Sequence, residues 1–262
     1  HLLFERWKTM TKIVAVTNQK GGVGKTTTAV NLSACIATLG HRVLLVDCDP
    51  QGNASSGLGI SRRKNALSIY DILLEDKDAA SVIKTTSVPL LNILPSNIQL
   101  AGAEVELADI HQREYRLRKA LKEVRQYYQY IILDCPPSLG LLTINALTAA
   151  NSVIIPLQCE YYALEGLSML VDTVQLVKRR LNPALVIEGI VFTMFDGRTN
   201  LSIEVVDEVK KHFSKEVYRT IIPRNIRLSE APSHGIPIIQ YDPKSRGAEV
   251  YRELAVEVLE RG

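Results

Sequence analysis

A segment rich in glycine and lysine near the start of the chain contains the residues best suited to bind phosphate. It reads Lys20-Gly-Gly-Val-Gly-Lys-Thr26 and connects a short apolar run to a helix-like run. Its ending matches the phosphate-binding pattern G-x-x-x-x-G-K-[ST], but Gln19 stands at the first glycine position and Lys20 follows it. Backbone N–H groups in such a loop bind phosphate oxygens at the positive end of a helix dipole. The spacing predicts a nucleotide-phosphate site that carries one additional lysine.

The positions within this loop predict separate roles. We expect Lys25 to neutralise the β- and γ-phosphate oxygens and the Thr26 hydroxyl to ligate Mg²⁺. The predicted nucleotide contacts in the loop are Gly21, Gly22, Val23, Gly24, Lys25, Thr26 and Thr27. A dinucleotide-binding G-x-G-x-x-G fingerprint is the nearest alternative, but Thr27 stands where its third glycine belongs. That fold also has no use for a Lys-Thr pair at the start of the helix, so we reject it.

Three aspartates follow or end apolar runs that are expected to be strands. Asp47 and Asp49 come at the end of the run 43–47, and Asp134 ends the run 130–134. Because parallel strands place their carboxyl ends at one edge of a sheet, these acids should lie near the phosphates. We expect Asp134 to bind Mg²⁺ through water, and Asp47 and Asp49 to have separate roles, one structural or near Mg²⁺ and one toward the γ-phosphate. A turn pair is the alternative for Asp47 and Asp49.

The elements that position these residues alternate between strand-like and helix-like runs. The expected strands are 13–17, 43–47, 90–94, 130–134, 153–156 and 187–194. The expected helices are 26–39, which ends before Gly40, and 116–128, 164–181 and 246–259. Strands that are apolar on both faces belong in a parallel sheet covered by helices on each side. We therefore predict one doubly wound, mostly parallel α/β domain over residues 10–262, with residues 1–9 as a non-native or disordered extension.

Composition narrows the class of protein. The chain has 262 residues, 46% of them hydrophobic and 23% charged, and a formal net charge of only +3, which is typical of a globular protein without an obligatory nucleic-acid partner. No apolar run is long enough to cross a bilayer. The four cysteines lack C-x-x-C spacing, which favours a reduced compartment. Local basic clusters such as Lys178-Arg179-Arg180 are interpreted as solvated surface.

Taken together, the motifs resemble one family. The segments that carry the resemblance are KGGVGKTT, VDCDPQGN, YIILDCPPSLG, PLQCEYYALEG and IPRNIRLSEAPSHGIPIIQYDPKSRGAEVY. They are similar to the ParA family of chromosome- and plasmid-partitioning ATPases, and the similarity runs from Met10 almost to the end of the chain. The family implies a Mg²⁺-dependent P-loop ATPase.

The resemblance also implies a cycle and assigns residues to it. In this family an ATP-bound monomer pairs face to face with a second copy, and the signature lysine, here Lys20, reaches the partner's phosphates. The catalytic residues implied are then Lys20, Lys25 and Asp49, with Asp49 facing the attacking water and Asp47 near Mg²⁺. Pro223, Arg224 and Asn225 match the segment that lines the adenine.

The family's partners follow from the same resemblance. Arg198 and Arg227 match positions implicated in non-specific binding of double-stranded DNA. Pairing two monomers doubles the phosphate contacts, so ATP would control DNA affinity without base readout. Hydrolysis would be stimulated by a ParB-type centromere-binding protein. A cytoplasmic, nucleoid-associated location without a membrane is expected.

Two other protein classes share the loop. A MinD-like ATPase that positions factors at the membrane would need a basic amphipathic C-terminal helix, whereas this chain ends in an acid-rich one, Glu253–Arg261. A redox protein of the nitrogenase iron-protein kind would need cysteines that hold a cluster between subunits, and Cys135 beside Asp134 is the candidate.

Overall fold

The computed structural model describes residues 11–61 and 66–261. The predicted extension 1–9 and the basic triplet 62–64 lie outside the described residues. Within the described ranges the strands form one seven-stranded sheet in the order β3-β4-β2-β5-β1-β6-β7. Every neighbouring pair is parallel except β3 and β4. The prediction of a doubly wound, mostly parallel sheet is confirmed.

Six of the strands coincide with the six predicted ones. They are β1 (Lys12–Val16), β2 (Val43–Asp47), β4 (Leu91–Leu94), β5 (Tyr130–Asp134), β6 (Ser152–Gln158) and β7 (Val186–Thr193). The seventh, β3 (Lys84–Thr85), was not predicted. It is a two-residue edge strand with both side chains exposed, so it lacks the apolar pattern by which a strand is recognised.

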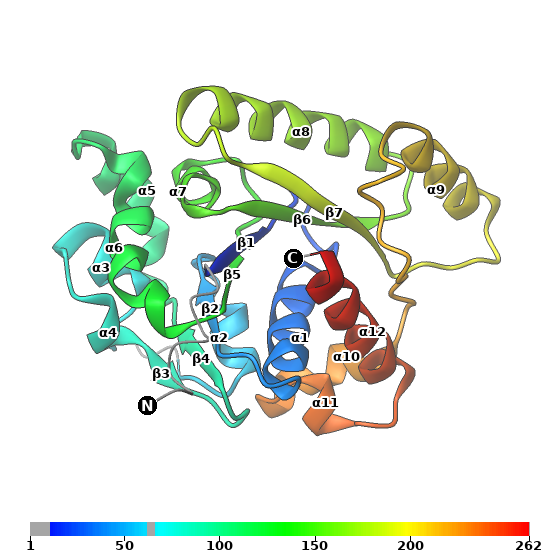
Figure 1. The fold of residues 1–262 in the computed structure, drawn as a ribbon, viewed down its shortest axis with the longest axis horizontal. Helices are drawn as coiled ribbons and strands as arrows, with labels where there is room; N and C mark the ends of the chain where they lie inside the picture. The colour runs from blue at the N-terminus through cyan, green and yellow to red at the C-terminus, as the bar shows by residue number, and fades with distance from the viewer. Residues whose placement is uncertain (1–10, 62–65, 262) are drawn as a thin grey trace, which may run out of the picture.

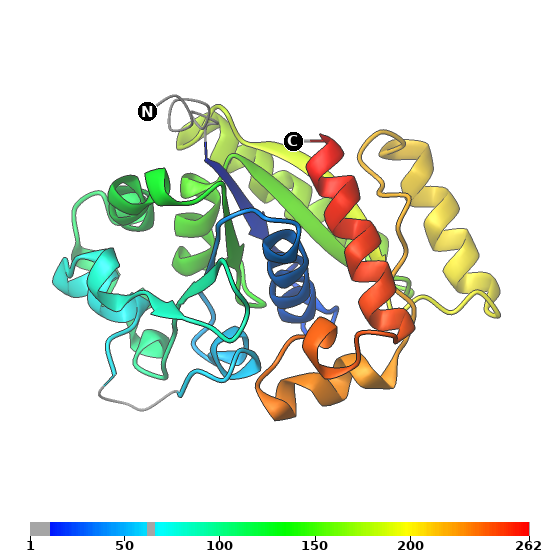
Figure 2. The ribbon, with the colours of Figure 1, turned by 60° about the horizontal axis from the view of Figure 1, so that its bottom comes forward.

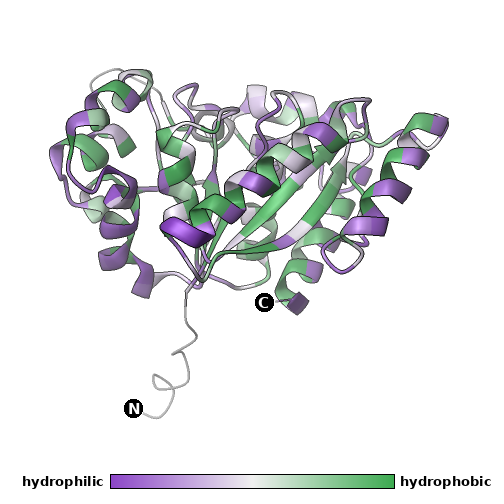
Figure 3. Cartoon of the chain, turned by 90° about the horizontal axis from the view of Figure 1, so that it is seen from above, coloured by the Kyte–Doolittle hydropathy of each residue, from purple (hydrophilic) through white to green (hydrophobic). Residues whose placement is uncertain are grey.

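Helices cover both faces of the sheet (Figures 1 and 2). On one face α1 (Lys25–Thr38) packs beside α12 (Arg246–Arg261), and on the other lie α6 (Arg116–Val124), α7 (Leu141–Ala149) and α8 (Ala163–Arg180). Alternate strand residues supply two separate cores, as Ile13 and Val14 of β1 do. Figure 3 shows hydrophobic strands between helices whose hydrophilic residues lie mostly outside.

The remaining helices are short, with one exception. They are α2 (Asn53–Gly57), α3 (Ile69–Glu75), α4 (Ala79–Val82), α5 (Leu100–Glu106), α9 (Asn200–His212), α10 (Ile226–Glu230) and α11 (Ile238–Tyr241). Neither α7 nor α9 was predicted. The predicted helix 116–128 is wrong in its last turn, because the α-helix ends at Val124 and a 3₁₀ turn, Arg125–Tyr127, follows. Gly40, with φ of 95°, ends α1 as its C′ residue, as predicted.

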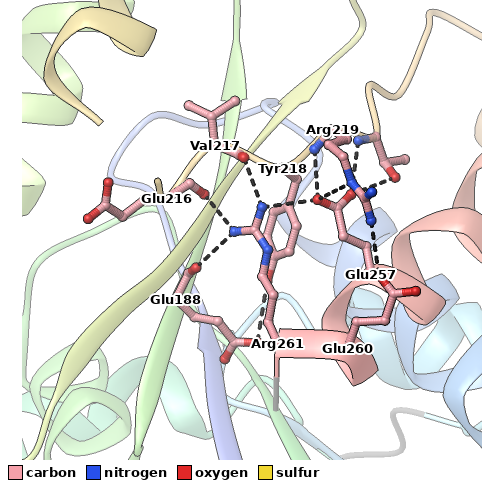
Figure 4. A network of polar contacts seen from close by, with 9 residues as sticks. Glu188, Glu216, Val217, Tyr218, Arg219, Glu257, Glu260 and Arg261 are labelled. Atoms are coloured by element: carbon pink, nitrogen blue, oxygen red, sulfur yellow. Dashed lines mark hydrogen bonds and ion pairs between the residues drawn. The ribbon is translucent and has the colours of Figure 1, made fainter. Parts of the chain in front are cut away.

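Buried polar contacts anchor the C-terminal end of α12 to the body of the domain (Figure 4). The Arg261 guanidinium donates to the carbonyls of Glu188, Glu216 and Val217 and lies 4.1 Å from the centre of the Tyr218 ring. Glu257, which is buried, accepts from the backbone N–H groups of Arg219 and Thr220 at 2.8 and 3.0 Å. Burial opposes ionisation of Glu257, but these donors and Arg261 together lower its pKa.

We predict that Glu257→Ala lowers the free energy of unfolding by about 2–4 kcal/mol, because it leaves buried donors and the Arg261 cation without their acceptor. Urea unfolding followed by circular dichroism measures the change. Glu260→Ala is the matched control, since the ion pair of Glu260 with Arg219 is exposed and its loss should change the same quantity by less than about 1 kcal/mol. Equal effects of the two substitutions would contradict the anchoring role.

Candidate functional site

The carboxyl ends of three neighbouring strands meet at one edge of the sheet. β5 lies between β1 and β2, and Asp134 at its end is in register with Val16 of β1 and with Asp47 of β2. The backbone continues this alignment, since Cys135 N donates to the Val16 carbonyl and Cys48 N to the Asp134 carbonyl. The glycine loop that follows β1 therefore lies beside both acid-bearing strand ends, as predicted.

The glycine loop turns tightly before α1. Gly22 and Gly24 have φ of 76° and 86°, in the left-handed region that side chains other than glycine rarely adopt. Lys25 Nζ donates to the Lys20 carbonyl at 2.7 Å, so the loop closes on itself. Thr193 Oγ1 at the end of β7 donates to the Val23 carbonyl at 2.8 Å, which supports the loop from an edge strand two positions away from β1. The fold thus presents successive loop amides at the N-terminus of α1.

The two lysines of the loop lie in different environments. Lys25 is buried, with 7% of its surface exposed, and burial lowers its pKa while the charges of Asp134 and Asp49 oppose the shift. The Lys20 side chain is 37% exposed and forms an ion pair with Glu160, in the loop between β6 and α8. Lys25 is therefore an internal cation of the site, and Lys20 is a cation at its surface.

Asp134 is a buried carboxylate that lacks donors. It is fully buried, and neither of its oxygens has a hydrogen-bond partner among the described residues. Burial raises its pKa well above the ordinary value, and the charge of Asp47 adds to this rise. The nearby Thr26 hydroxyl and the positive charge of Lys25 oppose the rise. A buried carboxylate of this kind either takes up a proton or pairs with a cation. Its place beside the Thr26 hydroxyl fits the oxygen ligands that Mg²⁺ prefers.

Asp47 and Asp49 differ in their contacts, although both are buried. Asp47 Oδ2 accepts from Ser55 N and Ser55 Oγ at 2.8 and 2.7 Å, and its Oδ1 accepts from Asp49 N at 3.2 Å. Burial raises the pKa of Asp47 to about 6, although the Ser55 donors oppose the shift. Asp49 Oδ1 accepts from Gln51 N at 2.9 Å. These bonds give Asp47 a role in holding the loop after β2, and its role near Mg²⁺ stays a prediction.

A cleft of about 420 Å³ opens beside the glycine loop. Its walls include Gly22, Gly24 and Thr27 on one side and Pro223, Arg224 and Asn225 on the other. The second segment is held by a bridge between Pro223 and Phe195, which follows β7. The structure therefore brings the segment predicted to line a base next to the predicted phosphate loop. The volume lies in the range typical of small-ligand sites.

The two predicted DNA-binding arginines lie near this cleft but are paired with acids. The Arg198 side chain, 89% exposed, binds both oxygens of Asp196 at 2.8 and 2.6 Å. Hydrogen bonds from Arg198 lower the pKa of Asp196, and the charge of Arg224 contributes. Arg227, the second residue of α10, pairs with Glu230 at 2.9 Å. Their exposure allows contact with an external ligand, and the assignment to DNA stays a prediction.

Sequence reasoning missed three residues that support the site. Thr193, Ser55 and Glu160 hold the glycine loop, Asp47 and Lys20 respectively. None of them occupies a motif position defined by phosphate chemistry. The contacts of Thr193 and Glu160 join segments far apart in the sequence, and that of Ser55 depends on how the chain turns over the eight residues after Asp47, which no short motif encodes.

Comparison with known proteins places this arrangement in a family. Residues 11–187 match the family described as an AAA domain. The chain is 64% identical over 253 residues to the sporulation initiation inhibitor protein Soj of Bacillus subtilis, covering 97% of this chain and all of that one. It is 55% identical to the chromosome partitioning protein ParA of Myxococcus xanthus, covering 97% and 90% of the two chains.

A solved structure extends the comparison to a bound nucleotide. Cobyrinic acid a,c-diamide synthase from Mycobacterium smegmatis, with bound ADP and magnesium, superposes with a TM-score of 0.84 at 40% identity, covering 96% of this chain and 95% of that one. Shared sequence over nearly the full length and a shared fold show that the chain belongs to the ParA/Soj family of chromosome-partitioning ATPases.

Proposed function

We propose that this chain is an ATP-dependent partitioning switch, in which an ATP-bound dimer binds DNA and hydrolysis releases it. The observation that carries the proposal is the pair of lysines in the glycine loop. Lys25 is buried inside the site, whereas Lys20 is presented at its surface. A second cation at the mouth of a phosphate site can reach the nucleotide of another molecule, as arginine fingers do.

The ligands of the site would be ATP and Mg²⁺. The cleft beside the glycine loop accommodates a base, and the ADP and magnesium of the Mycobacterium smegmatis protein support this assignment. Bound Mg²⁺ would supply positive charge that polarises the phosphoryl oxygens. Asp134 and Thr26 would hold the metal, with Asp47 in its surroundings. Lys25 would neutralise the phosphates, and Asp49 would orient the attacking water.

DNA binding would depend on pairing because each copy contributes few contacts. Arg198 and Arg227 are neutralised by Asp196 and Glu230, so phosphates must compete with these carboxylates. A single copy therefore gains little from DNA, while a dimer sums the contacts of two copies. A ParB-type partner would stimulate hydrolysis, and the dimer would be associated with the nucleoid.

A membrane-positioning function like that of MinD is the alternative. Within 11–61 and 66–261, no helix combines the length and apolarity needed to span a bilayer. The apolar face of α12, including Val250, Leu254 and Val258, is buried in the core that it shares with α1. Its exposed face carries Glu249, Glu253 and Glu260 beside Arg246 and Arg252, so it lacks the cationic surplus that binding to anionic lipid requires. These features favour DNA as the surface to which the dimer binds.

The switch predicts opposite behaviour for two variants. With ATP and Mg²⁺, the unaltered chain should form dimers and shift a DNA duplex. Lys20→Ala should remain monomeric because the cation that bridges the two sites is gone, and Asp49→Ala should accumulate as a DNA-bound dimer because water is not activated. Light scattering coupled to size exclusion, read beside a DNA mobility shift, measures both. Full ATP-dependent dimerisation of Lys20→Ala would exclude the bridging role.

Replacing the buried Asp134 carboxylate should stabilise the ligand-free protein and weaken Mg²⁺ binding. Without nucleotide, Asp134→Asn should raise the free energy of unfolding by about 1–3 kcal/mol near neutral pH, because an unpaired buried charge is removed. The folded-state pKa of Asp134 lies above its unfolded value near about 3.9, so the fold binds the proton more tightly and loses stability as the pH rises from the unfolded pKa to the folded one. The gain should therefore disappear as the pH falls toward the unfolded value.

The same variant should lose the rise in Tm that Mg²⁺ adds to ATP binding, because Asp134 would hold the metal. Thermal unfolding with ATP, with and without Mg²⁺, measures this. A variant that is destabilised near neutral pH and keeps the full Mg²⁺-dependent shift would refute the metal-binding assignment.

The DNA assignment predicts a charge-dependent loss. Arg227→Glu should weaken DNA binding by tenfold or more and reduce the salt slope of the dimer by about two, one phosphate contact per copy. Hydrolysis without DNA should be unchanged. Lys119→Glu makes the same change in charge at an exposed lysine that pairs with Asp76 and should leave DNA binding near that of the unaltered chain. Equal losses in both variants would indicate a bulk charge effect only.

A further inference from the structure

A second cleft, of about 370 Å³, lies at the opposite edge of the sheet from the glycine loop. It includes Ile13 near the start of β1, and Asn151 N donates to the Ile13 carbonyl there. Its walls come from α6 and the 3₁₀ turn after it, from the C-terminal end of α7 and the residues that follow, and from the segment that follows α8. Figure 1 shows where these helices lie relative to β1. We call it the basic cleft, defined by Arg118, Lys122, Arg125, Thr148, Asn151 and Asn182.

Three cations project into this region from one side of a helix. Arg118 and Lys122 lie on α6, four residues and about 6 Å apart along its axis, and Arg125 begins the 3₁₀ turn that follows the helix. All three are exposed, and none forms an ion pair within the described part of the chain. By contrast, the neighbouring Arg116 and Lys119 both pair with Asp76. The positive charge of the basic cleft is thus uncompensated.

The walls of the basic cleft also contain the polar side chains of Asn151, Asn182 and Thr148. Asn151 uses its Oδ1 to accept from Ile13 N at 2.7 Å, and its amide N–H groups remain as donors. Asn182 is buried and donates to the carbonyls of Leu147 and Ala150, which fixes this wall. Thr148 is 1% exposed, and its hydroxyl has no hydrogen-bond partner among residues 11–61 and 66–261. Buried hydroxyls normally have a partner.

We propose that the basic cleft binds an acidic, extended segment of a protein partner. Carboxylates at alternate positions of an extended peptide repeat about every 6.6 Å, close to the spacing of the cations on α6. The peptide backbone supplies carbonyl acceptors that can reach the amide N–H groups of the exposed Asn151. A DNA duplex is too wide to enter a cleft of this volume, and it would leave those groups unsatisfied. The site lies apart from the nucleotide edge, so it is independent of the switch.

The test uses a fluorescein-labelled decapeptide of alternating glutamate and alanine. Its affinity for the full chain is measured by fluorescence anisotropy at low salt, where exposed charge pairs are least screened. The triple variant Arg118→Gln, Lys122→Gln and Arg125→Gln should bind the decapeptide about tenfold more weakly, because three charge pairs are lost. Circular dichroism confirms that the variant is folded.

Two further variants distinguish binding in the basic cleft from non-specific electrostatic attraction of the decapeptide to the protein. The triple variant Lys77→Gln, Lys84→Gln and Lys215→Gln removes the same charge from other exposed positions and should bind the decapeptide as the unaltered chain does. Asn151→Asp keeps the acceptor for Ile13 N but places a negative charge in the basic cleft, so binding should weaken about fivefold.

The proposal is overturned by any of three results. The first is an equal loss in the two triple variants, which would mean that only net charge matters. The second is normal decapeptide binding by Asn151→Asp, which would mean that the ligand does not enter the basic cleft. The third is a tenfold loss of duplex DNA binding in the α6 variant with decapeptide binding unchanged, which would make this surface a nucleic-acid contact.

Discussion

The interaction on which the site depends most is the compensation of the buried Asp134 carboxylate, because an isolated charge is costly to bury. The central strands carry two aspartates in register, Asp134 and Asp47, and both are shielded from water. Asp47 is compensated by donors from Ser55 and Asp49, whereas Asp134 has no such donor among the described residues. One acid is therefore satisfied by the fold, whereas the charge of the other is opposed in part by Lys25 and, in the proposed function, would be balanced by a metal ion. A buried carboxylate of this kind lowers the free energy of unfolding of the ligand-free protein, and the same carboxylate would strengthen the binding of a cation.

The same edge explains how one loop can serve two molecules. The turn of the loop, its support from Thr193 and the buried position of Lys25 make a rigid anion site within the chain. Lys20 precedes the tight turn, so its side chain remains at the surface, where Glu160 is its present partner. A carboxylate can be exchanged for a phosphate at little cost in an exposed pair. The geometry thus places Lys25 inside the anion site and Lys20 at its surface, where the proposed contact between copies would form.

Two features outside the site are related to it by position. One is the anchored helix α12, and the other is the basic cleft at the opposite edge of the sheet. Anchoring of α12 through Glu257 and Arg261 keeps its apolar face against α1, the helix that follows the glycine loop (Figures 2 and 4). The basic cleft lies at the amino end of β1, the strand whose carboxyl end leads into the glycine loop. Two ligand surfaces separated by the length of the strands allow a partner to bind without blocking the nucleotide.

Local patterns in the sequence determined the six parallel strands, the helix after the glycine loop and the candidate residues Lys20, Lys25, Asp47, Asp49 and Asp134, because apolar periodicity and phosphate-binding spacing are short-range properties. They did not reveal β3, which is two residues long, or α7, whose apolar residues lack a helical period. The helix α9 was also missed, although Val205, Val206 and Val209 do recur at helical spacing. The tertiary structure alone decided that Asp47 is held by Ser55, that Asp134 lacks donors, and that Lys20 meets Glu160. The contact of Lys20 with Glu160 joins residues far apart in the chain. The states of Asp47 and Asp134 depend on the balance of burial and hydrogen bonding around each charge. Neither kind of information is encoded in a local pattern.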